Sequence, residues 1–69
     1  MERAYIVLGY LVRKARVDQG MSVEELAKRV DAGASSIRSL EIGKQRTPFH
    51  KIIKIVNILD IDLNDIRNV

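Results

Sequence analysis

Hydrophobic residues recur along this chain at helical spacing, in short runs that polar or glycine-containing segments separate. The first run carries its apolar residues three or four positions apart, at Ala4, Leu8, Leu11, Val12 and Ala15. Gly20 follows this run, and a glycine in that place commonly ends a helix. No segment shows the alternation that is typical of a half-buried strand. The pattern therefore predicts an all-α chain.

Two short helices are predicted in the middle of the chain. Ser22 lies three residues before Glu25, which is the spacing of a capping box, and a helix is expected over Val23 to Val30. The segment Asp31 to Gly33 then interrupts the apolar pattern, which resumes over Ala34 to Ile42. A three-residue turn between two short helices is therefore expected.

Two more helices are predicted towards the end of the chain. Thr47 offers an N-cap and Pro48 the first helical position of a helix that runs to Leu59. Asp62 offers an N-cap to a short fifth helix that runs to Ile66. The core is expected to include Leu26, Ala27, Ile37, Leu40, Ile52, Val56 and Leu59.

Length and composition narrow the classes of function. The 69 residues allow one small domain, spanning 1–69, and the absence of cysteine excludes disulfides and thiolate metal sites. His50 is the single histidine and is expected at the surface, so no metal or other cofactor is predicted. The sequence also has no nucleophile with a matching base and no phosphate-binding loop. We therefore expect neither an enzyme nor a small-molecule substrate.

Membrane insertion is not expected either. The longest apolar run, Ala4 to Val12, falls far short of the roughly 20 residues that span a bilayer. Arg13, Lys14 and Arg16 follow it, where a signal peptide would carry small residues for cleavage. The predicted location is the cytoplasm.

The two short helices and their turn, with one helix before them and two after, form the arrangement of a helix-turn-helix motif. Over Leu8 to Ile66 the chain resembles the lambda-repressor-like family, which comprises the Cro and repressor domains of phages and their bacterial relatives. The motifs that carry this resemblance are RVDQGMS (16–22), EELA (24–27), Ser36-Ile37, LEIGKQRTP (40–48) and Ile61-Asp62-Leu63. The resemblance implies a compact five-helix DNA-binding domain with the motif at helices two and three.

Three positions depart from the family pattern. Val23 stands where the family usually has a glutamine that contacts a phosphate. Asp31 takes a turn position that is commonly glycine, and aspartate tolerates the left-handed backbone conformation better than most residues. Gly33 holds the usual Ser or Thr N-cap position, where glycine is a weaker cap. The fold is expected to survive all three departures.

Charge is unevenly distributed along the chain. Residues 34–54 contain five basic residues and one acid, a net charge of +4, whereas residues 55–69 have three acids and one arginine, a net charge of −2. The positive segment coincides with the second motif helix and the loop after it, where a duplex would lie. A solvated basic face without a ligand is the alternative reading.

The resemblance also assigns contacts with DNA. By this resemblance, the positions that reach base edges are Ala34, Ser35 and Ser39, and Arg38 lies next to them in the base-reading set. Three of these side chains are short and discriminate little between bases, so Arg38 is the main candidate for sequence readout, with a phosphate contact as its alternative role. The positions that face the DNA backbone are Ser22, Ser36, Lys44, Gln45 and Arg46.

The resemblance further implies a partly buried ion pair between Arg16 and Glu41. The resulting hypothesis is a sequence-specific regulator of transcription that binds double-stranded DNA as a homodimer on a palindromic operator. Its dimer surface is expected at residues 60–66 by resemblance, or else at residues 5–10. The alternative is a protein-interaction module with the same fold, such as an antitoxin, because Tyr5 to Tyr10 carry apolar residues beyond the main face of the first helix.

Overall fold

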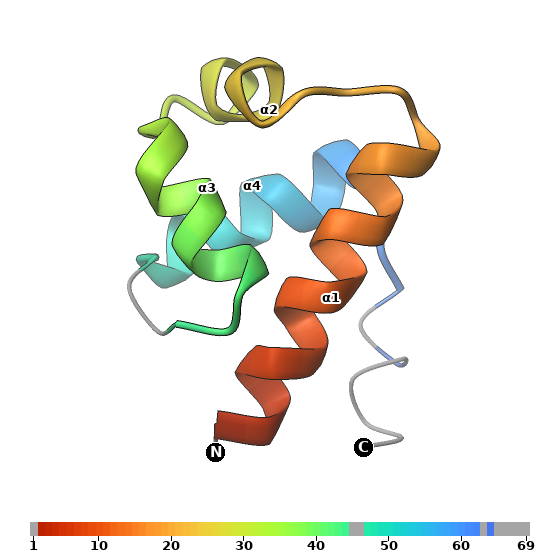
Figure 1. Ribbon diagram of the computed structural model, residues 1–69, viewed down its shortest axis with the longest axis vertical. Coiled ribbons are helices and arrows are strands. Elements are labelled where there is room, and N and C mark those ends of the chain that lie inside the picture. The colour runs from red at the N-terminus through yellow and green to blue at the C-terminus, as the bar shows by residue number, and fades with distance from the viewer. Residues whose placement is uncertain (1, 45–46, 63, 65–69) are drawn as a thin grey trace.

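Figure 1 shows the computed structural model, which describes residues 2–44, 47–62 and 64. The described residues contain no strand and form four helices. These helices are α1 (Glu2–Asp18), α2 (Val23–Arg29), α3 (Ala34–Glu41) and α4 (Phe49–Leu59). The predicted all-α class is therefore confirmed for the described residues, which contain four of the five expected helices.

Most of the expected fifth helix falls outside the described residues. Asp62 and Asn64 are the members of this segment that the structure describes, and Asp62 Oδ1 accepts a hydrogen bond from the Asn64 N–H at 2.9 Å. An aspartate side chain that binds a backbone N–H two residues on forms an Asx turn.

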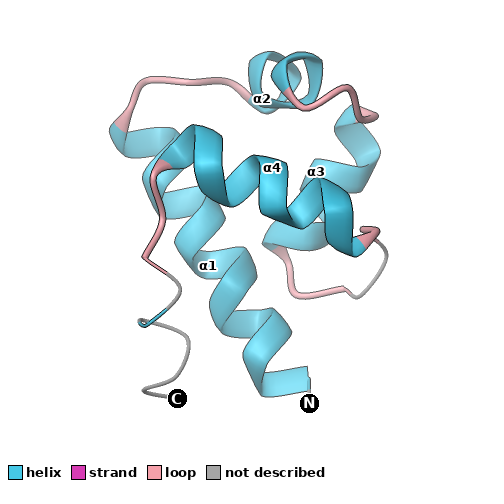
Figure 2. Ribbon diagram, turned by 180° about the vertical axis from the view of Figure 1, so that it is seen from behind, coloured by secondary structure: helices cyan, strands magenta, loops and turns pink. Residues whose placement is uncertain are grey.

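The helices pack around one shared core. α3 packs against both α1 and α2, and α1 also packs against α4. In Figure 1, α2 lies across the top of the molecule, and in Figure 2 α4 crosses in front of α1 and covers the side that lies away from the viewer in Figure 1. This arrangement leaves one long side of α3 uncovered by any other described helix.

The predicted core is confirmed in full. The buried apolar residues are Leu8, Val12, Met21, Leu26, Ala27, Val30, Ile37, Leu40, Ile52, Ile55, Val56 and Leu59. One prediction for α1 is wrong, because Ala4 is exposed. Its place on the inner face is taken by Tyr5, which packs against the core and precedes Leu8 and Val12 by one and two helical turns.

Gly9 allows α1 and α3 to approach each other closely. A Cβ atom at this position would overlap the carbonyl oxygen of Leu40 and would lie 3.0 Å from that of Glu41. The backbone of α1 therefore touches the last turn of α3 directly. The apolar pattern did not reveal this contact, because a glycine inside a helix does not specify which backbone lies against it.

The predicted start of the last described helix is wrong by one residue. Pro48 is the N-cap of α4, with φ at −59°, and its backbone is extended. Thr47 is buried instead of capping α4, and its hydroxyl donates to the carbonyl oxygen of Ser36 at 3.5 Å. The hydroxyl thus joins the loop to α3 and has no part in starting α4.

Candidate nucleic-acid interface

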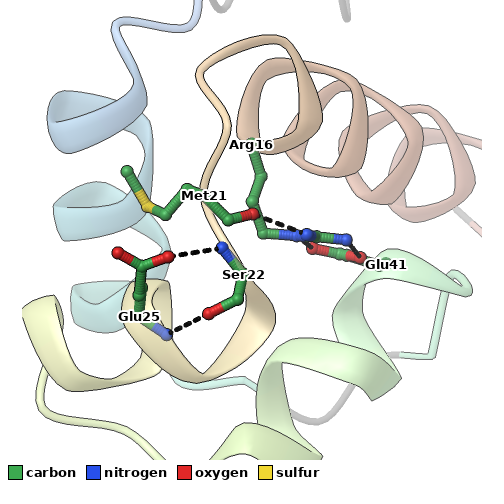
Figure 3. Close-up of polar contacts among 5 residues, drawn as sticks. All are labelled: Arg16, Met21, Ser22, Glu25 and Glu41. Carbon is green, nitrogen blue, oxygen red and sulfur yellow. Dashed lines mark hydrogen bonds and ion pairs between the residues drawn. The ribbon is translucent and has the colours of Figure 1, made fainter.

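The first motif helix begins at a capping box, as the sequence predicts. The Glu25 N–H donates to Ser22 Oγ and the Ser22 N–H donates to Glu25 Oε1, both at 3.0 Å (Figure 3). These two bonds satisfy backbone donors that the first turn of a helix otherwise leaves unpaired. The Ser22 hydroxyl accepts in this arrangement, so its own proton can be donated to another group.

The capping box should make part of the stability depend on pH. The hydrogen bond from the Ser22 backbone lowers the pKa of Glu25. A carboxylate whose pKa is lowered in the folded state stabilises the fold at pH values above the ordinary glutamate pKa. This stabilisation is lost as the pH falls through the lowered pKa. We expect the unfolding temperature to fall between about pH 5 and about pH 3, and to fall less in Glu25→Gln, whose amide keeps the bond to Ser22. An equal fall of the unfolding temperature in the wild type and in Glu25→Gln over this pH range would contradict this.

The turn between α2 and α3 is held by a residue from α4. Asp31 has a φ of 56°, the left-handed conformation expected of it. Lys51 Nζ donates to the carbonyl oxygens of Val30 at 3.2 Å and of Asp31 at 2.5 Å. A cation at these carbonyl groups stabilises the end of α2. The net charge of +4 for residues 34–54 includes Lys51. Its side chain, however, is only 20% exposed and points to the turn, so it is not part of the outer basic face.

α3 turns a short polar face outward. Ile37 and Leu40 anchor it in the core, and Gly33 is its N-cap without a side-chain bond, as expected. Ser35 and Arg38 are exposed, whereas the other predicted base-facing and backbone-facing residues of the helix are half-buried, namely Ala34, Ser36 and Ser39. Lys44 is exposed just after α3, and the predicted residues Gln45 and Arg46 lie outside the described part of the chain.

Arg38 does not stand alone on this face. Its Nη2 donates to Glu24 Oε2 at 2.5 Å, which joins the last turn of α3 to the first turn of α2. The side chains of Arg38 and Glu24 remain 57% and 66% exposed. The Glu24 backbone N–H and the bond from Arg38 together lower the pKa of Glu24. Sequence reasoning missed this pair, because the two residues are fourteen positions apart on different helices.

The predicted partners Arg16 and Glu41 form an ion pair that joins α1 to the end of α3. Arg16 Nε and Nη2 donate to the two carboxylate oxygens of Glu41 at 2.7 and 3.0 Å, and Arg16 Nη1 donates to the Met21 carbonyl oxygen at 2.8 Å (Figure 3). The two charged side chains are 11% and 6% exposed. The hydrogen bond to Glu41 raises the pKa of Arg16. One guanidinium thus fixes α1, the end of α3 and the chain entering α2.

An exposed arginine on α1 adds to the basic character of this side. Arg13 lines an open hollow of about 430 Å³ together with Arg38, Ser39, Glu41 and Ile42. Arg13 therefore lies beside α3, although it was not among the predicted DNA-contacting residues. The sequence offers one signal for this position: Arg13 precedes Arg16 by one helical turn, so both lie on the same side of α1. Two exposed cations, Arg13 and Arg38, thus share this hollow, and the exposed Lys44 lies three residues after the end of α3.

Within the described ranges, no helix is long and apolar enough to cross a bilayer. Comparison with curated proteins and with solved structures gives no match. Comparison with protein-family models matches residues 12–66 to HTH_3, a helix-turn-helix family of the XRE or lambda-repressor-like type. This match covers all the described motif residues and the Arg16–Glu41 pair. On this geometry and this match, the chain belongs to the HTH_3 helix-turn-helix family.

Proposed function

We propose that this protein is a sequence-specific regulator of transcription that places α3 in the major groove of double-stranded DNA. Membership of the HTH_3 family suggests a DNA-binding regulator. The observation that carries the proposal is the outer face of α3, where Ser35 and Arg38 are exposed, with the exposed Lys44 three residues after the helix ends. A helix of this kind fits the width of the major groove, and nearby cations contribute affinity for phosphates.

The residues of the interface divide into two roles. Arg38 is the base-reading residue, because a guanidinium can donate to guanine O6 and N7. Ser35 and Ser39 are short, indiscriminate donors and acceptors, and Ala34 offers a methyl contact to thymine. Phosphate contacts come from Ser22, Ser36, Lys44, Gln45 and Arg46, together with Arg13.

We expect two copies to act together on a palindromic operator. Half-sites about 10 base pairs apart present successive major grooves on one side of the duplex to two such helices. Of the two candidate dimer surfaces, residues 60–66 are described only at positions 60–62 and 64, and residues 5–10 include the exposed Ile6 and Tyr10. A bacterial or phage regulator of this kind would work in the cytoplasm.

The exposed side of α1 favours a second candidate, a protein-interaction module such as an antitoxin. Ile6, Tyr10 and Val17 are 58%, 60% and 56% exposed. Their spacing of four and seven residues places them along one side of the helix. An apolar stripe of this kind commonly marks a protein contact. It is compatible with base contacts by α3, because the stripe lies on α1 and the proposed base-reading residues lie on α3.

Binding titrations at several salt concentrations test the proposal. We expect the chain to bind random duplex at low salt and to lose affinity steeply as salt rises. Sequence selection from a random pool should then return a two-fold symmetric site. A chain that binds no duplex at low salt would contradict the proposal and favour the protein-interaction module, whereas a chain that binds all sequences equally would be a non-specific DNA-binding protein and would contradict sequence readout.

Two variants separate the predicted roles. Arg38→Ala should cost about 1 to 3 kcal/mol on the selected duplex and much less on random duplex, because it removes a base contact. Lys44→Ala should weaken both duplexes alike and reduce the log–log salt slope by about one unit, because it removes a phosphate contact. Lys54→Ala is the control, since Lys54 is exposed on α4. Equal losses on both duplexes for Arg38→Ala would make Arg38 a backbone contact.

A further inference from the structure

An acidic residue lies on the surface that is proposed to meet DNA. Glu24 is in the first turn of α2 and its side chain is 66% exposed. A carboxylate near phosphates opposes binding, so its presence there calls for a role. A contribution to stability does not explain the presence of Glu24, because an ion pair between two exposed side chains contributes little to folding.

The contact with Arg38 suggests that role. Glu24 Oε2 receives one N–H of the guanidinium, at 2.5 Å from Nη2. A guanidinium has five N–H groups, so the remaining ones can still donate to guanine. The pair as a whole, however, carries no net charge, and a phosphate therefore attracts it less than it would attract an unpaired arginine.

We propose that Glu24 is a specificity-determining residue of the DNA-binding surface. Its carboxylate holds Arg38 in an ion pair, which weakens the attraction of Arg38 for phosphates and reserves the guanidinium for the uncharged acceptors of a base edge. Because phosphate contacts dominate binding to random sequences, Glu24 lowers non-specific affinity more than specific affinity. This inference rests on the proposed function and adds a residue that the resemblance does not assign.

The chain offers a matched control. Glu24→Gln removes one negative charge from the first turn of α2 and leaves the positive charge of Arg38 without its counter-ion. Glu25→Gln removes the same charge one position away, and glutamine can keep the capping bond to Ser22. Any effect of overall charge is common to both variants, whereas loss of the ion pair with Arg38 occurs only in Glu24→Gln.

The experiment measures the affinity of each variant for a short random-sequence duplex and for the duplex selected by the wild-type chain. Glu24→Gln should bind random duplex about threefold to tenfold more tightly than Glu25→Gln does, with a log–log salt slope steeper by about 0.9. Its affinity for the selected duplex should rise less, so the ratio of specific to non-specific affinity falls. In an Arg38→Ala background, Glu24→Gln should act no differently from Glu25→Gln.

Other outcomes overturn the inference. If the two glutamine variants behave alike with Arg38 present, or if Glu24→Gln weakens only the selected duplex, Glu24 does not restrain Arg38 from phosphates. Those results would leave DNA binding by the wild-type chain intact. Failure of the wild-type chain to bind any duplex would instead overturn the proposed function, and this inference with it.

Discussion

Arg16→Ala is expected to destabilise the fold by about 3 to 5 kcal/mol, because it leaves a buried carboxylate without its partner. Glu41 is 6% exposed and receives two hydrogen bonds from Arg16, while the Met21 carbonyl oxygen receives a third. Native domains have total stabilities of only about 5 to 15 kcal/mol, and this one is small. We therefore expect Arg16→Ala to be largely unfolded near physiological temperature, as circular dichroism melts would show.

Arg13→Ala is the control for the loss of an arginine from α1. Arg13 is exposed on the same helix, so its replacement should change stability by no more than about 0.5 kcal/mol. The double variant Arg16→Met with Glu41→Leu should recover much of the loss, because apolar residues often replace a buried ion pair at little cost. Equal melting temperatures for Arg16→Ala and Arg13→Ala would show that the pair does not hold the helices together.

Gly9→Ala is expected to cost about 3 kcal/mol, the upper end of what overpacking usually costs. The added methyl group would overlap the Leu40 carbonyl oxygen, which is backbone and cannot rotate away. α1 and α3 must then separate, and the packing of Leu8 and Val12 in the core is lost along that interface. Urea unfolding of the wild type and the variant measures the difference.

Gly33→Ala provides the comparison for Gly9. A Cβ atom at Gly33 would meet only the Ser35 hydroxyl oxygen, at 3.8 Å. Gly33→Ala therefore places alanine at a glycine position without a steric clash. It should lower the free energy of unfolding by well under half as much as Gly9→Ala does, mostly because alanine is a poorer N-cap than glycine. A loss at Gly33 as large as that at Gly9 would mean that close helix contact is not the reason for the glycine in α1.

The local features of the fold could be predicted from the sequence. The capping box at Ser22 depends on residues three positions apart, and the left-handed turn at Asp31 depends on the tolerance of one residue type. The burial of the core followed from helical periodicity. The Arg16–Glu41 contact was reached through the family resemblance, since its partners are 25 positions apart.

Contacts between helices could not be predicted in this way. Glu24 and Arg38 meet because α2 and α3 cross at a particular angle, which no local pattern specifies. Lys51 reaches the turn because α4 packs close to it. A charge count along the sequence cannot show this packing, so it placed the cation of Lys51 on the outer surface. Thr47 is an N-cap candidate by residue type, but its hydroxyl donates to the Ser36 carbonyl oxygen of α3, and α4 has no side-chain capping bond. Each of these depends on the packing of helices that are distant in sequence.

The central claim is that the outer face of α3 binds double-stranded DNA. Amide spectra of ¹⁵N-labelled chain, recorded during titration with the selected duplex, test it residue by residue. We predict the largest shift changes at Ser22, Ser35, Arg38 and Lys44, and small changes at Lys54 on α4. Changes centred on the apolar stripe of α1, at Ile6, Tyr10 and Val17, with none along α3, would contradict it.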